Sequence, residues 1–184
     1  MNNKEIELKF KINTEIREKI IQDLEILAKK VNEYRMIDTY YIPYFREFEV
    51  DGETMECVRI REAFGKSVLT YKKIHREANP VYCDEFETEV LSAEEMEKIL
   101  FALGFSVQMK IDKTRVSYAY QSLEFDFDSV AGVGELMEVE LKSETESTDE
   151  IFEFVKKYGL SKDDVTYDGI QVLVKKANQK NTLK

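Results

Sequence analysis

The sequence predicts an α+β protein in which eight antiparallel strands close into a barrel with a charged lumen. Seven strand-like stretches carry charged residues at alternate positions, which places the charges of each stretch on one face. Apolar residues occupy the positions between them, and amphipathic helical stretches elsewhere in the chain can cover that second face. Hairpin-type connections between strands imply antiparallel pairing. Because a closed sheet has two faces and no edges, we expect charges inside and apolar side chains outside, under helices.

Eight stretches have the alternation and the residue content of strands. They cover residues 3–12, 34–42, 55–63, 67–74, 81–91, 105–120, 122–130 and 135–143. Asp51-Gly52 is a turn signal before the third strand, and Gly65-Lys66 joins the third and fourth strands as a hairpin. The apolar face expected from the alternation comprises Ile6, Leu8, Ile60, Phe86, Phe125, Phe127, Met137, Val139 and Leu141.

Helical stretches alternate with the strands, and their apolar residues recur at three- and four-residue spacing. Helices are expected from Asn13 or Thr14 through Val31, from Ser92 to Gly104, from Ser147 to Gly159, and over 168–177. Ser92 and Glu95 have the spacing of a capping box, which marks the start of the second helix. No linker or repeat interrupts the pattern, so we expect a single domain over 1–178 and a frayed tail over 179–184.

The composition is typical of a folded protein that acts on small molecules. The 184 residues are 43% hydrophobic and 35% charged, enough to bury a sizeable core. The net charge of −10 is unfavourable for nucleic-acid binding, so we expect no nucleic-acid partner. No apolar run approaches the roughly 20 residues of a membrane span, and residues 1–20 lack the apolar core of a signal peptide. We therefore expect no membrane partner and a cytoplasmic location.

The charges on the strands are segregated by sign. The cations are Lys9, Arg59, Arg61, Lys72, Lys113 and Arg115. The carboxylates are Glu5, Glu7, Asp128, Glu138 and Glu140, with Glu85 and Glu87 as possible further acidic residues of the lumen. Guanidinium and ammonium groups suit phosphate oxygens, and an all-oxygen ligand set without His or Cys suits Mg²⁺ or Mn²⁺. A single such strand is equally well read as a solvated sheet face, but the recurrence favours an interior that holds a polyanion and its metal ions.

Several short motifs follow one another in a fixed order over residues 5–140. They are Glu5-x-Glu7-x-Lys9, Asp38-Thr39-Tyr40-Tyr41, Val58-Arg59-Ile60-Arg61, Thr70-Tyr71-Lys72, Glu85-Phe86-Glu87, Lys113-Thr114-Arg115, and a final acidic segment from Asp128 to Glu140. In this order they resemble the CYTH family, the triphosphate tunnel metalloenzymes, which include class IV adenylate cyclases, thiamine triphosphatases and inorganic triphosphatases. Val133 and Leu136 are mild departures from the family pattern.

The resemblance implies a tunnel of eight antiparallel strands that binds a triphosphate together with a divalent metal. It makes Glu5, Glu7, Glu138 and Glu140 metal ligands, with Asp128 as a further one. The six cations listed above would bind the triphosphate, and Lys9 would also act as the catalytic residue that helps to activate the attacking group. Family members often form dimers, so a homodimer is possible.

The resemblance leaves the reaction open. We favour hydrolysis of tripolyphosphate or a nucleoside triphosphate by metal-activated water, because nothing in the sequence recognises an adenine ring. The absence of Trp also removes one stacking group for the ring of thiamine triphosphate. The alternative enzyme is an adenylate cyclase that converts ATP to cyclic AMP and pyrophosphate. A further alternative is a protein that binds triphosphate or polyphosphate without turnover.

Overall fold

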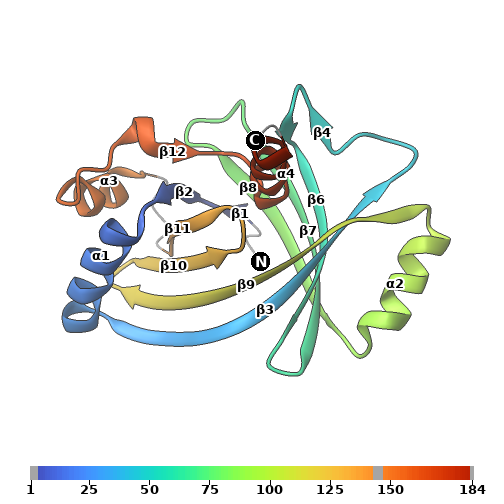
Figure 1. The fold of residues 1–184 in the computed structure, drawn as a ribbon, viewed down its shortest axis with the longest axis horizontal. Helices are drawn as coiled ribbons and strands as arrows, with labels where there is room; N and C mark the ends of the chain where they lie inside the picture. The colour runs from blue at the N-terminus through green and yellow to red at the C-terminus, as the bar shows by residue number, and fades with distance from the viewer. Residues whose placement is uncertain (1–3, 143–146, 183–184) are drawn as a thin grey trace. The chain divides into compact units, whose positions relative to one another are not determined.

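The computed structural model describes residues 4–142 and 147–182 (Figure 1). Its strands are β1 (Lys4–Glu5), β2 (Glu7–Ile12), β3 (Lys29–Pro43), β4 (Glu49–Val50), β5 (Glu53–Thr54), β6 (Glu56–Ala63), β7 (Lys66–His75), β8 (Tyr82–Val90), β9 (Phe105–Tyr120), β10 (Leu123–Val130), β11 (Gly134–Leu141) and β12 (Val165–Thr166). Its helices are α1 (Thr14–Leu27), α2 (Ala93–Ala102), α3 (Asp149–Lys156), α4 (Ile170–Thr182) and the short 3₁₀ helix η1 (Lys162–Asp164). None of the described helices is long and apolar enough to cross a membrane.

The strands form a ten-stranded sheet in the order β1-β8-β7-β6-β3-β9-β10-β11-β2-β12, and β4 pairs with β5 separately. The registers of the β6, β7, β10 and β11 pairs are antiparallel, which confirms the predicted α+β class. The chain divides into two compact units, which are described separately below. Unit 1 comprises residues 1–4, 35–112 and 168–184, and unit 2 comprises residues 5–34 and 113–167. The strands β3 and β9 contribute residues to both units.

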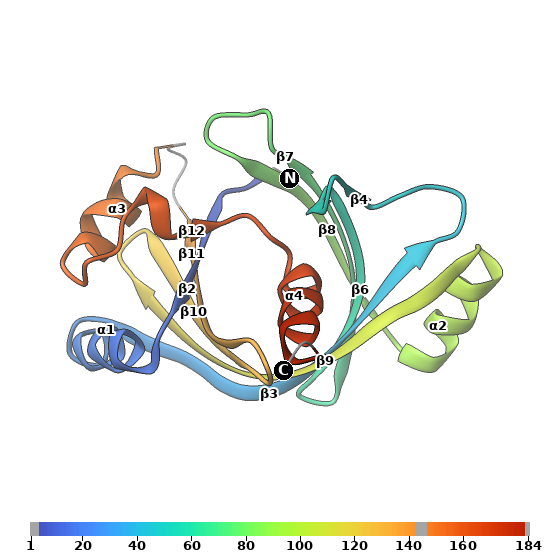
Figure 2. The ribbon, with the colours of Figure 1, turned by 45° about the horizontal axis from the view of Figure 1, so that its top comes forward.

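Unit 2 buries one face of its strands under α1 and α3. The side chains of Phe10, Phe125, Phe127, Met137 and Val139 are fully buried on this face. The ring of Phe154 on α3 packs on Phe125, with 4.5 Å between ring centroids. Figure 2 shows both helices beside the strands β2, β10 and β11. Here the predicted apolar face and its helical cover are confirmed.

Unit 1 has a helix on each side of its strands (Figure 2). On one side, Leu100 of α2 joins a buried apolar cluster with Val58 and Ile60 of β6. On the other side lies α4, whose buried Gln171 donates a hydrogen bond to Thr54. In unit 1 the predicted cover of the apolar face is therefore supplied by α2, and α4 packs on the other side. The polar residue Gln171 among its buried positions suits a helix that packs on a polar surface.

Several predicted boundaries differ from the structure. Helix α1 ends at Leu27, and Val31, predicted on the helix, lies in strand β3. The first predicted strand is interrupted at Ile6, and β12 adds a further short strand, so the sheet exceeds the predicted eight. Helix α4 continues to Thr182, past the predicted end at 177. Predicted strand residues 3 and 143 lie outside the described residues.

Phe86 is the one residue of the expected apolar face that is exposed among those described, at 51%. The other eight are all buried. Helix α2 packs its apolar side on β3 and β6, so the apolar side of β8 receives no such cover. The ring of Phe86 lies 6.3 Å from that of Tyr71 on the neighbouring strand. The prediction of burial at Phe86 is wrong because alternation fixes a face but not whether a helix reaches it.

Candidate functional site

In unit 1, Arg59 and Arg61 are placed by the apolar residues beside them. Val58 and Ile60 are buried in the cluster under α2, so the period of two along β6 turns both arginines to the opposite face. The register of β6 with β3 then sets Asp38 directly opposite Arg61. The sequence alternation thus becomes a charged face that spans neighbouring strands.

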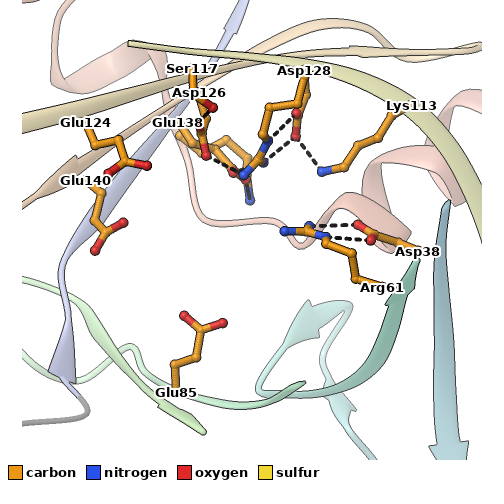
Figure 3. A network of polar contacts seen from close by, with 12 residues as sticks. Asp38, Arg61, Glu85, Lys113, Ser117, Glu124, Asp126, Asp128, Glu138 and Glu140 are labelled. Carbon is orange, nitrogen blue, oxygen red and sulfur yellow. Dashed lines mark hydrogen bonds and ion pairs between the residues drawn. The ribbon is translucent and has the colours of Figure 1, made fainter. Parts of the chain in front are cut away.

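Asp38 holds both arginines. Its side chain is fully buried, and it accepts hydrogen bonds from Nε and Nη2 of Arg61 at 2.8 and 2.9 Å (Figure 3). Nη1 of Arg59 lies 3.8 Å from Oδ2 of the same carboxylate. Burial alone would lower the pKa of Arg59, but Asp38 raises it above its ordinary value. The buried guanidinium group of Arg59 therefore stays charged.

A second row of contacts crosses β6, β7 and β8. Nη2 of Arg59 donates to the hydroxyl of Thr70 at 3.2 Å, and that hydroxyl donates to Oε1 of Glu87 at 2.7 Å. Two residues further along β7, Nζ of Lys72 lies 3.0 Å from Oε2 of Glu85, its register partner on β8. The two acidic residues of β8 that the sequence marked as possible lumen residues thus bind cations of unit 1.

In unit 2, Asp128 plays the part that Asp38 plays in unit 1. It is fully buried, its register partner is Arg115, and it accepts hydrogen bonds from Nε and Nη2 of that arginine at 2.7 Å each. Nζ of Lys113 donates to the same carboxylate at 2.5 Å (Figure 3). Burial would raise the pKa of Asp128, but Arg115 and Lys113 hold it below the usual range.

Arg115 also gathers other carboxylates of unit 2. Its Nη1 donates to Asp126, and its Nη2 donates to Oε2 of Glu138 at 2.6 Å. Glu138 in turn forms an ion pair with Nζ of Lys9 at 3.0 Å. Burial raises the pKa of Asp126 although Arg115 opposes the shift. Five sequence-predicted residues therefore belong to one connected network, namely Lys9, Lys113, Arg115, Asp128 and Glu138.

An acidic cluster lies further along the strands of unit 2. Glu140 of β11 is the register partner of Glu7 on β2 and of Glu124 on β10. Burial, together with the negative charges of Glu5 and Glu7, raises the pKa of Glu140 to about 7. Nζ of Lys142 lies 2.5 Å from Glu140 and 3.5 Å from Glu124, and it offsets part of the repulsion. Figure 3 shows Glu124 and Glu140 side by side.

The family model described as the CYTH domain matches residues 3–167. The chain belongs to the CYTH family. Family members are adenylate cyclases or triphosphatases, which act on small-molecule triphosphates. The resemblance seen in the sequence motifs is therefore confirmed.

This CYTH protein is similar in sequence to an archaeal protein and in fold to several solved structures. A protein of Methanocaldococcus jannaschii named "Putative adenylate cyclase" is 28% identical over 166 residues, which cover 87% of this chain and 93% of the relative. A solved Pyrococcus horikoshii structure is 27% identical with a TM-score of 0.77, and the match covers 92% of this chain and 99% of that one. A Hippeastrum protein described as having a dominant triphosphatase activity shares the fold at 16% identity, a TM-score of 0.62 and 90% coverage of both chains.

The carboxylates of unit 2 fit a divalent cation in type. Glu5, Glu7 and Glu140 provide only hard oxygen ligands, and burial together with the charges of Glu5 and Glu7 raises the pKa of Glu140, a cost that a bound cation would relieve. Within the described residues, however, no group of three such side chains is arranged as a metal site. Lys142 pairs with Glu140 and Lys9 with Glu138, so ammonium groups occupy the carboxylates. The metal assignment remains a prediction.

The structure also contains charged-face residues that the sequence reasoning left out of the site. They are Asp38, Thr70, Ser117, Glu124, Asp126 and Lys142. Asp126 and Lys142 continue the two-residue spacing of Asp128 and Glu140, so parity alone could have found them. Asp38 and Thr70 stood inside recognised motifs, but their partners lie on other strands, which no local pattern reveals.

Proposed function

We propose that this CYTH protein hydrolyses a triphosphate in a reaction that depends on Mg²⁺ or Mn²⁺. The observation that supports it most is the charge content of the faces described above. They provide guanidinium, ammonium and carboxylate groups, which are the groups that phosphate and metal chemistry require. Hydrolysis needs nothing further from the substrate than its phosphates. A cyclase would also need groups that bind ribose and adenine.

The proposed phosphate ligands are the cations of the two units. In unit 1 they are Arg59, Arg61 and Lys72, and in unit 2 they are Lys9, Lys113 and Arg115. The arginines and Lys113 contact buried aspartates, and Lys72 and Lys9 contact glutamates. These contacts keep the side chains ordered, so less conformational entropy is lost when phosphate oxygens bind. The charge that develops on the leaving phosphate would be stabilised by these same groups.

The proposed metal ligands are Glu5, Glu7, Glu138 and Glu140, with Asp128 as a further one. When bound, Mg²⁺ or Mn²⁺ would neutralise phosphate charge and lower the pKa of a coordinated water. To bind this cation, Glu140 would exchange Lys142, and Glu138 would exchange Lys9 and Arg115. Asp128 would have to give up hydrogen bonds from Lys113 and Arg115 that engage both of its oxygens.

Lys9 is the proposed catalytic residue. Its ammonium group lies 3.0 Å from Glu138, so it stands next to a proposed metal ligand. From there it can hold the attacking oxygen by a hydrogen bond and stabilise negative charge on it. In the reaction that oxygen bonds to the terminal phosphorus, the bond to the bridging oxygen breaks, and the electron pair leaves with the diphosphate product.

Adenylate cyclase activity is the second candidate. The observation that favours it is the name of the Methanocaldococcus jannaschii relative, which aligns with 87% of this chain. In that reaction the ribose 3′-hydroxyl attacks the α-phosphorus and pyrophosphate leaves. The Hippeastrum description shows that this fold also occurs in a protein with dominant triphosphatase activity.

The deciding experiment incubates the purified protein with tripolyphosphate, ATP or thiamine triphosphate, each under Mg²⁺, Mn²⁺ or EDTA. Orthophosphate, pyrophosphate and cyclic AMP are quantified together. Orthophosphate release that requires metal, without cyclic AMP, supports the proposal and ranks the substrates. Cyclic AMP with stoichiometric pyrophosphate establishes the cyclase instead. Binding of triphosphate without any product identifies a non-catalytic binding protein.

A further inference from the structure

Asp38 is unusual because one buried carboxylate serves two arginines. It binds the Nε and Nη2 edge of Arg61 through both oxygens (Figure 3). Nη1 of Arg59 lies 3.8 Å from Oδ2 of the same carboxylate. The other carboxylates near Arg59, those of Glu87 and Glu85, are at 3.6 and 3.9 Å. Direct hydrogen bonds thus fix Arg61 completely and leave Arg59 only partly neutralised.

The arginines keep donors that the described part of the chain does not use. Nε of Arg59 is buried and has no hydrogen-bond partner among the described residues, and the whole side chain is only 10% exposed. The bidentate bond occupies one edge of the Arg61 guanidinium. Within the described residues, Nη1 of Arg61 makes no hydrogen bond. Buried donors are nearly always paired in native proteins, so the buried Nε of Arg59 calls for a partner that the described residues do not supply.

A stabilising role does not account for this arrangement. Removing charges from water is expensive, and a buried ion pair is often no more stable than apolar residues of similar size. Ile60 lies on the other face of these strands in a buried apolar cluster, so this part of unit 1 can bury apolar side chains. What the carboxylate does provide is a fixed orientation for two guanidinium groups.

We infer that Asp38 is a positioning residue, which orients Arg59 and Arg61 so that their unused N–H groups donate hydrogen bonds to phosphate oxygens. It acts through the arginines and does not itself touch the substrate. This inference rests on the proposed function, because it supposes that the two arginines bind phosphate. It adds a residue that the set of cations and carboxylates did not include.

Charge and positioning predict opposite outcomes when Asp38 is neutralised. If the carboxylate contributed only its charge, Asp38→Asn would make the face more positive and strengthen the binding of a polyanion. If it positions the arginines, the same substitution frees both side chains and weakens that binding. The sign of the change therefore separates the two roles.

The experiment measures binding of tripolyphosphate by calorimetry in EDTA, so that no turnover interferes. We expect Asp38→Asn to raise Kd by about tenfold or more, the change that one hydrogen bond between charged groups produces. The matched control is Asp112→Asn, which removes an exposed carboxylate that binds Arg35 in the same unit, and its Kd should stay within about twofold. Unchanged or tighter binding in Asp38→Asn overturns the inference.

A double-mutant cycle tests that the effect passes through the arginine. In an Arg61→Gln background, Asp38→Asn should have a smaller effect on Kd than in the wild type, because the arginine that Asp38 binds through both oxygens is gone. Equal effects in both backgrounds contradict a positioning role. Failure of the wild type to bind tripolyphosphate contradicts the proposed function itself, so the two failures are distinguishable.

A fold control completes the test. Near-ultraviolet circular dichroism of each variant shows whether side-chain packing is kept. If Asp38→Asn does not fold, Asp38→Glu keeps the charge and moves the carboxylate by one methylene, and it should also weaken tripolyphosphate binding. If Asp38→Glu binds like the wild type, or if neither variant folds, Asp38 is structural and the inference is wrong.

Discussion

Glu7 and Glu140 stand directly opposite each other on β2 and β11. Like charges at opposed positions of a sheet destabilise it, and the charges of Glu5 and Glu7 add to the burial that raises the pKa of Glu140 to about 7. Such a pair persists where function requires it, because sites that bind cations concentrate negative charge at the expense of stability.

The substitution Glu140→Gln should therefore stabilise the metal-free protein while it abolishes metal-dependent turnover. We expect a gain on the order of 1 kcal/mol at pH 7.5, after allowance for partial exposure. Urea unfolding in EDTA and product assays in Mg²⁺ and Mn²⁺ measure the two effects. Glu135→Gln is the control, since Glu135 binds Arg17 and Ser129, and it should keep its turnover. Near-wild-type activity in Glu140→Gln would falsify its assignment as a metal ligand.

Asp128→Asn should destabilise the protein strongly even without metal. It leaves Lys113 and Arg115 buried beside a neutral amide, and breaking a buried ion pair from one side costs roughly 3–5 kcal/mol. Asp126→Asn should cost less, about 1–2 kcal/mol, because burial already disfavours the charge of Asp126. Urea denaturation in EDTA compares the two variants. Equal losses would show that Asp128 is not the anchor of these cations.

Thr70→Val should weaken the use of substrate without loss of the fold. The hydroxyl of Thr70 joins Arg59 to Glu87, and valine has the same shape but neither donates nor accepts. We expect KM for the triphosphate to rise about three- to tenfold, since the lost bond involves charged groups. Steady-state kinetics measure this, and Thr88→Val, at an exposed threonine of β8, is the matched control. An unchanged KM would mean that Arg59 is held adequately without Thr70.

His75 should make stability depend on pH near neutrality. Hydrogen bonds with Asp84, and secondarily with Glu77, raise its pKa above the ordinary value, and its ring stacks on Tyr82. A group whose pKa is higher in the folded state stabilises fully below its unfolded pKa of about 6.5 and loses that effect as pH rises through the folded value. The melting temperature of the wild type relative to His75→Gln should therefore fall from pH 5.5 to 8.5. A constant difference across this range would contradict the proton linkage.

The face on which each charged strand residue lies could be predicted from the sequence. Glu7, Lys9, Arg59 and Glu138 alternate with buried apolar neighbours as expected, because side chains of a strand point to opposite faces whatever the strand pairs with. The ordered motifs were also sufficient to identify the CYTH family, which the match over residues 3–167 confirms. Both the alternation and the motifs depend on residues close together in the chain, so they can be recognised without knowledge of the fold.

The pairing of charges could not be predicted, because each pair joins segments far apart in the chain. Asp38 and Arg61 meet through the register of β3 with β6, and Arg115 meets Glu138 across β10. The sequence placed Asp128 with the metal ligands from its acidity, whereas the structure shows both of its oxygens bound to cations. Likewise, the sequence of helix α4 does not indicate on which face of the sheet the helix packs.

The sequence by itself therefore determined the alternation, the charged faces and the family, since each of these depends on residues only a few positions apart. The tertiary structure decided which carboxylate neutralises which cation, which donors of Arg59 remain unused, and why Phe86 is exposed. Those outcomes depend on strand register and on where helices dock, which are set by the packing of the whole chain and by no single segment of it.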